Sequence, residues 1–157
     1  MPADLNPPNN LRQVLYQLSM DFAENRIQHA KTAIKNSLES GNDETKSTAG
    51  DKHETGRAMA QLEQEKAARQ LQESLFLRGQ LQRIDPDRMS LSVSEGSVVF
   101  TNKANFYISI AAGKLKVENT EFIAISSASP LGQKFLGQHA GTTIEMNQVP
   151  YLIEKII

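Results

Sequence analysis

Four carboxylates lie within twelve residues near the middle of the chain: Asp43, Glu44, Asp51 and Glu54. Residues 41–50 between and around them include no large apolar side chain, which predicts a solvated loop. Carboxylate oxygens are hard ligands for Mg²⁺, which commonly takes one or two of them and fills its other positions with water or a second molecule's oxygens. Such a loop could complete a metal site on a partner.

A structural explanation of two of these acids competes with metal binding. Asp51 is followed three residues later by Glu54, the spacing of a capping box, in which both side chains bond backbone amides at a helix N-terminus. Acids at a helix N-terminus are also favoured by the helix dipole. Spacing alone favours capping over metal binding. The two interpretations are compatible, because a cap would orient an acid at the end of the loop.

The residues and motifs of the common catalytic sites are absent from the sequence. The chain has no cysteine, which excludes disulfides, thiolate metal sites and cysteine nucleophiles. Its three histidines, His29, His53 and His139, are far apart and show no paired spacing. Neither a GxSxG elbow nor a glycine-rich phosphate loop is present. We therefore expect no self-contained catalytic site.

The elements that must position the acids follow from a change of composition near residue 85. Residues before it are rich in Gln, Glu, Lys, Arg, Ala and Leu, whereas Ser, Val, Ile, Phe, Thr and Gly dominate after it. Because these sets favour helices and strands respectively, we predict a helical domain over residues 1–84 and a β-rich domain over residues 87–157. A junction near Asp85-Pro86-Asp87 would separate them.

Apolar periodicity predicts two long helices in the first domain. One runs over residues 11–38 and stops at Gly41, and the other runs over residues 51–84 and ends before Pro86. Helices of this length measure about 45 Å and would form an antiparallel coiled-coil hairpin with an acidic tip around residues 41–56. The apolar residues of the second helix that we assign to the hairpin seam and its end are Met59, Leu62, Ala67, Leu71, Leu75, Leu81 and Ile84.

The second domain shows short strand patterns separated by turn signals. Strands are predicted over residues 90–93, 97–101, 106–110, 114–117, 122–126, 142–146 and 151–156. Ser129-Pro130 predicts the start of one short helix that Gly137 closes. The predicted fold class is α+β, with a helical hairpin followed by an antiparallel β domain and one short helix.

Two stretches resemble the Gre-type bacterial transcription elongation factors. The run from Ile125 to Gly132, with the sequence ISSASPLG, is similar to the family's Ser-Pro-Leu/Ile-Gly signature, and the similarity continues to Glu145. The run from Gly50 to Gly56, with the sequence GDKHETG, is similar to the family's Gly-Asp-x-x-Glu tip. The resemblance implies an FKBP-like C-terminal domain that docks on RNA polymerase and a coiled-coil arm that enters the polymerase's secondary channel.

The resemblance also implies roles for particular residues. Asp51 and Glu54 would help to position a magnesium ion shared with the polymerase, which then cuts backtracked RNA itself, so no cofactor would be bound stably by this chain. Asp43 and Glu44 would join them in contacting the partner. On the C-terminal domain, the resemblance assigns polymerase docking to Ser129, Pro130, Leu131 and Gly132.

The tip departs from the family where Lys52, Thr55 and Arg57-Ala58 replace its usual residues. One alternative is therefore a channel-binding regulator that inhibits or competes without stimulating cleavage. Others are a hairpin module with a non-polymerase partner and, from the implied FKBP-like fold alone, a prolyl isomerase or chaperone.

Charge and targeting features complete the expectations. The net charge is −1, so nucleic acid would be reached only indirectly, through RNA polymerase core. The N-terminal residues show no secretory signal, and no apolar run has bilayer length. We expect a cytoplasmic monomer without membrane contact.

Overall fold

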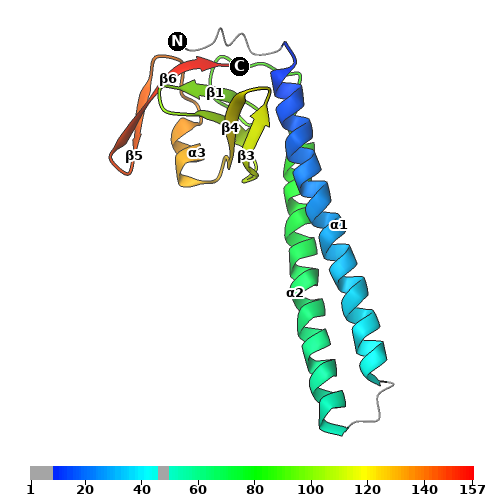
Figure 1. Ribbon diagram of the computed structural model, residues 1–157. Coiled ribbons are helices and arrows are strands. Elements are labelled where there is room, and N and C mark those ends of the chain that lie inside the picture. The colour runs from blue at the N-terminus through cyan, green and yellow to red at the C-terminus, as the bar shows by residue number, and fades with distance from the viewer. Residues whose placement is uncertain (1–8, 46–49) are drawn as a thin grey trace. The chain divides into compact units, whose positions relative to one another are not determined.

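The structure is a computed structural model that describes residues 9–45 and 50–157, with side chains described for residues 9–41 and 54–157 (Figure 1). The chain divides into two compact units. One joins Met1–Asp21 to Gly79–Ile157, and the other is Phe22–Arg78. The two long helices are α1, Leu11–Thr45, and α2, Gly50–Gln82, and the division cuts both of them. The start of α1 and the end of α2 therefore belong with the strands, not with the hairpin.

Within Phe22–Arg78, the helices meet along a seam of mostly small residues. Ala60, Ala67 and Ser74 are buried on α2 at seven-residue spacing, and Ala23 and Ala30 are buried at the same spacing on α1. This is the heptad spacing of a coiled coil. Small side chains let helix backbones approach closely. The buried side chain of Ile27 adds the larger apolar contribution on α1.

The seam differs from the predicted one. Met59, Leu62 and Leu75 are 55%, 59% and 39% exposed, so assigning them to the seam was wrong. These large apolar residues determined the predicted periodicity of the second helix. The two helices instead pack through small residues, which contribute little to a hydrophobic pattern. On α1, Ala23 is buried four residues before the buried Ile27, so a small residue again belongs to the seam.

The helix ends also differ from prediction. α1 continues through Gly41 to Thr45, so the predicted stop at Gly41 was wrong. Gly41 faces α2, where an added Cβ would lie 3.8 Å from the Cβ of Ala60, and this packing offsets the low helix propensity of glycine. α2 begins at Gly50, which places Asp51 inside the first turn and not at the cap position that the capping box requires. Residues 46–49 of the predicted loop lie outside the described residues.

The other unit contains a mixed six-stranded sheet in the order β3-β4-β2-β1-β6-β5 (Figure 1). Its strands are β1 Val98–Thr101, β2 Asn105–Ser109, β3 Gly113–Val117, β4 Thr120–Ser126, β5 Thr143–Met146 and β6 Val149–Ile156. All pairs are antiparallel except β2 with β4, which is parallel, so the sheet differs from the predicted antiparallel one in this pair. β3 lies at one edge of the sheet. β4 lies between β3 and β2, antiparallel to β3 and parallel to β2.

Two details of this sheet depend on local conformation. Asn147 and Gln148 join β5 to β6 with φ values of 53° and 65°, as in a type I′ hairpin turn.

Residues 90–93, predicted as a strand, instead form an isolated bridge between Ser92 and His139. The other six predicted strands are present with ends shifted by one to two residues.

Both faces of the sheet are covered by helices of the same unit. Leu11 and Leu15 of α1 are buried in one core with Tyr107 and Phe122. On the other face, α3, Pro130–Phe135, contributes the buried ring of Phe135, whose centroid lies 5.2 Å from that of Phe106. The start of α1 is thus part of the β-rich core. Neither α1 nor α2 is apolar enough, over the part of the chain described, to cross a bilayer.

Candidate functional site

The predicted tip acids lie at the connected ends of the two helices. Asp43 and Glu44 are in the last turn of α1, and Asp51 and Glu54 are in the first two turns of α2. The helix dipole favours negative charge at the start of α2 but disfavours it at the end of α1. The last turn of α1 carries no basic residue. No positive side chain of that turn therefore offsets the charges of Asp43 and Glu44.

A magnesium ion shared with a partner stays a prediction at these positions. Glu54 is exposed on α2, and position 51 lies on the same side of the helix, because residues three apart are surface neighbours. Among the side chains that the structure describes, no three His, Asp or Glu residues converge as a metal site. Magnesium can use one or two carboxylates with oxygens from another molecule. Asp51 and Glu54 could supply such a pair.

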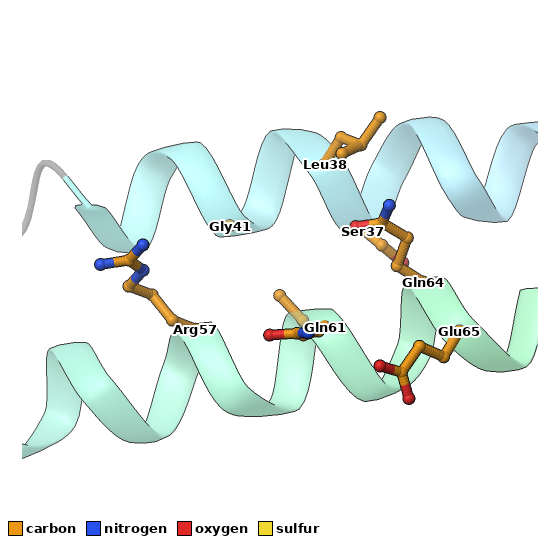
Figure 2. A pocket seen from close by; sticks show the side chains of 8 residues that line it. Ser37, Leu38, Gly41, Arg57, Gln61, Gln64 and Glu65 are labelled. Atoms are coloured by element: carbon orange, nitrogen blue, oxygen red, sulfur yellow. The ribbon is translucent and has the colours of Figure 1, made fainter.

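A groove runs between the helices next to the acids (Figure 2). Its volume is about 420 Å³. Arg57 extends from α2 toward α1 within it, while Gly41 contributes no side chain from α1 (Figure 2). The lining residues are Ser37, Leu38, Gly41, Arg57, Ala60, Gln61, Gln64 and Glu65. Sequence reasoning noted Arg57 as a departure from the family but did not place it in a groove.

The Ser-Pro-Leu-Gly run forms the start of α3. The Ser129 side chain caps the helix: its Oγ accepts a hydrogen bond from the Gly132 amide at 3.0 Å and donates one to the Ser126 carbonyl at 2.7 Å. Pro130 occupies the first turn, where its missing N–H costs nothing. Gly132 is buried, and an added Cβ would collide with the Ser126 carbonyl oxygen. In the order Ser-Pro-x-Gly, the serine thus caps the helix, the proline starts it and the glycine avoids a collision with the backbone.

The four residues assigned to docking differ in accessibility. Pro130 is exposed, Ser129 and Leu131 are half-buried, and Gly132 is buried. Leu131 packs against the core that contains Phe135. Capping and packing account for most of this signature, so a partner would meet chiefly the ring of Pro130. Docking through these residues stays a prediction.

Sequence reasoning missed a buried polar group in the β-rich core. The Arg12 side chain is 7% exposed, and its Nε donates to the Gly96 carbonyl at 3.3 Å. The Tyr107 hydroxyl is buried without a hydrogen-bond partner among the described residues, and burial raises its pKa well above the usual value, partly opposed by the nearby Arg12 charge. The sequence carries no signal for this, because a charged residue beside the apolar positions of an amphipathic helix is typical of a solvated face.

Comparisons with known proteins give a similarity to a solved structure. No protein-family model and no curated protein matches the chain. A solved structure described as that of the transcription factor Gfh1 aligns over 94% of this chain and 94% of its own, with 17% sequence identity and a TM-score of 0.33.

Proposed function

We propose that this protein is a Gre-type transcription elongation factor that binds RNA polymerase core, inserts the hairpin tip into the secondary channel and promotes cleavage of backtracked RNA. The observation that carries the proposal is the placement of four acids at the connected ends of α1 and α2. The Ser129-to-Gly132 turn supports it, since this signature of the resemblance folds as a capped helix against a sheet.

Electrostatics at the tip agree with a role that is completed by a partner. Asp43 and Glu44 end α1, where the dipole opposes them, and Glu54 is exposed on α2. The end of α1 carries two of these acids, and the start of α2 carries the other two. A cation held by another molecule would relieve their repulsion, so binding would be strongest where such a cation is present.

Asp51 and Glu54 would hold the shared magnesium together with oxygens of the polymerase. When bound, such an ion lowers the pKa of water and neutralises charge on a phosphate. The contribution of this chain is to deliver two carboxylates and to orient them from consecutive turns of one helix. The polymerase, not this protein, would be the nuclease.

A second candidate function is a channel-binding regulator that does not stimulate cleavage. Lys52, Thr55 and Arg57 favour it, because they replace family residues beside the acids. Such a protein would retain polymerase binding while blocking the channel for substrates or for other factors. Binding and cleavage must therefore be measured separately.

The test uses stalled, backtracked RNA polymerase with magnesium. Transcript shortening and the Kd for the complex are compared for the wild type and an Asp51→Asn, Glu54→Gln double variant. A Glu63→Gln, Glu73→Gln double variant is the control, because these exposed acids lie farther along α2. We expect shortening by the wild type and the control and its loss, by at least tenfold in rate, in the tip variant.

Other outcomes separate the alternatives. Binding without shortening by the wild type would indicate the inhibitory regulator. Failure of the wild type to bind core polymerase at micromolar concentration would overturn the proposal and favour a hairpin module with another partner.

A further inference from the structure

Another groove lies in the middle of the hairpin, and all the residues that line it belong to the unit Phe22–Arg78. Its volume is about 540 Å³, which is within the range of small-molecule sites. Helix α1 supplies most of the wall, and α2 supplies the rest. The aromatic and polar side chains of the lining are Phe22, Asn25, Arg26, His29, Gln70 and Ser74. None of the lining residues is an Asp or a Glu, so the groove is positively charged.

Arg26 is held over this groove by an aromatic ring. Its guanidinium carbon lies 5.5 Å from the ring centroid of Phe22, which precedes it by four residues on the same side of α1. Among the described residues, the guanidinium has no partner in an ion pair or a hydrogen bond. The nearest acid along the helix, Glu24, pairs instead with Arg78 at 3.2 Å. The N–H donors of Arg26 are therefore available to a ligand.

Further donors line the same groove next to Arg26. His29 follows it by three residues on the same side of the helix, is exposed, and forms neither a hydrogen bond nor an ion pair with a described residue. The side-chain amides of Asn25 and Gln70 are also exposed. Ser74 contributes less, because its hydroxyl donates to the Gln70 carbonyl at 2.6 Å. The groove thus offers a guanidinium, an imidazole and two amides, without an acid that would compete for them.

Charges around the groove do not offset its positive charge. On α2, the charged neighbours of Gln70 on the helix surface are Lys66 and Glu73, which have opposite signs. On α1, residues 25–38 include no acid, whereas two lysines follow Arg26 in that range. The middle of α1 is therefore basic, in contrast to the acidic end of the hairpin.

The number and spread of the donors indicate the class of ligand. Asn25 and His29 are about 6 Å apart along the helix axis, farther than one small anion such as sulfate can bridge. A carboxylate offers two oxygens, whereas linked phosphate groups offer many anionic oxygens that reach donors on consecutive turns. A guanidinium binds such oxygens in a bidentate manner, and neutral N–H groups can bind the others.

We infer that this groove binds a small polyphosphate anion, such as the di- or triphosphate group of a free nucleotide, through Arg26 and His29 with the amides of Asn25 and Gln70. The inference goes beyond the proposed function and does not depend on it. Because a bound polyphosphate would reverse the positive charge of this side of the hairpin, its concentration would control how this side meets a charged partner.

Isothermal titration calorimetry of the full-length protein with ATP and with inorganic triphosphate tests the inference, in magnesium-free buffer at constant ionic strength. We expect both to bind, since they share the linked phosphates. Equal Kd values would show that the phosphates alone are recognised, and tighter binding of ATP would identify a nucleotide as the ligand. Arg26→Gln should weaken binding about tenfold. Arg26→Lys should recover only part of the loss, because an ammonium lacks the planar fork.

Lys31→Gln is the matched control, because it removes the same charge from the same helix. Lys31 is exposed and lies outside the lining, and it projects from the other side of α1 because it follows His29 by two residues. This variant should leave both Kd values unchanged. All the substituted residues are exposed, so circular dichroism should show an unaltered fold. Equal weakening by Lys31→Gln and Arg26→Gln would show attraction to net charge alone and would overturn the inference.

Other results would also contradict the site. Sulfate that binds as tightly as triphosphate would indicate an adventitious ion only. Arg26-dependent binding of a single-stranded RNA, with no binding of ATP or triphosphate, would indicate a contact with a nucleic-acid backbone instead. No heat of binding up to millimolar ligand would overturn the inference outright. Polyphosphate binding by a protein that fails to bind RNA polymerase would leave this inference standing and overturn the proposed function.

Discussion

Gly132 is the residue where a single methyl group should matter most. It is buried, and a Cβ there would collide with the carbonyl oxygen of Ser126, a backbone atom that cannot rotate away. We expect Gly132→Ala to lower the free energy of unfolding by about 1–3 kcal/mol, a typical cost of overpacking. Urea titration followed by circular dichroism measures the change.

Gly79→Ala is the matched control. Gly79 lies inside α2 with nothing within 4 Å of the position of an added Cβ. Because alanine is the better helix former, this variant should gain about 0.5–1 kcal/mol. Destabilisation of similar size by both variants would contradict the explanation based on the Ser126 contact.

The buried hydroxyl of Tyr107 predicts a pH effect. Burial raises the pKa of Tyr107, so the folded state keeps its proton at a pH where the unfolded chain, with an ordinary pKa near 10, releases it. Stability is therefore fully present below about pH 10 and falls as the pH rises above it. We expect Tyr107→Phe to be less sensitive than the wild type when urea unfolding is compared at pH 8.5 and pH 11.

At pH 8.5 this variant should be at least as stable as the wild type. The hydroxyl makes no hydrogen bond to a described residue, so its removal relieves the cost of a buried polar group. Equal loss of stability by both proteins at pH 11 would show that Tyr107 does not titrate on unfolding.

The pairing of α1 with α2 depends on the small residues of the seam. Ala67 is 3% exposed on α2, whereas its neighbour Ala68 is exposed. We expect Ala67→Leu to force the helices apart and to destabilise the hairpin by about 1–3 kcal/mol, while Ala68→Leu has little effect. Thermal melting followed at 222 nm compares them, and equal melting temperatures would contradict the close seam.

The division of the chain predicts which fragments fold. Leu11 and Leu15 are buried with Tyr107 and Phe122, so the sheet needs the start of α1. We expect residues 87–157 alone to lack cooperative unfolding and native chemical-shift dispersion in NMR spectra, because a face of the sheet would be uncovered.

A chain in which a Gly/Ser linker replaces residues 22–78 is the control. It retains Met1–Asp21 and Gly79–Ile157, the whole of one compact unit. This shortened protein should unfold cooperatively. Cooperative folding of residues 87–157 alone, with stability equal to the control, would show that the start of α1 is dispensable.

Much of the candidate site followed from residue types and spacing. The two long helices and the short helix at Ser129-Pro130 were predicted and are present. Asp43 and Glu44, predicted in a loop, lie instead in the last turn of α1. The groove beside Arg57 was not predicted, because it depends on Gly41 of one helix facing α2 of the other. Spacing along one helix does not reveal what the other helix brings opposite it.

The sequence by itself determined the kind and order of the elements, since helix propensity, alternation and capping act between residues close in the chain. Only the tertiary structure decided the rest. The half-buried Gly41 continues the helix where it faces α2, small residues and not Met59 or Leu62 form the seam, and β4 pairs in parallel with β2. These outcomes depend on which segments, far apart in the chain, bury apolar surface against each other. The free energy of that burial cannot be read from the pattern of neighbouring residues.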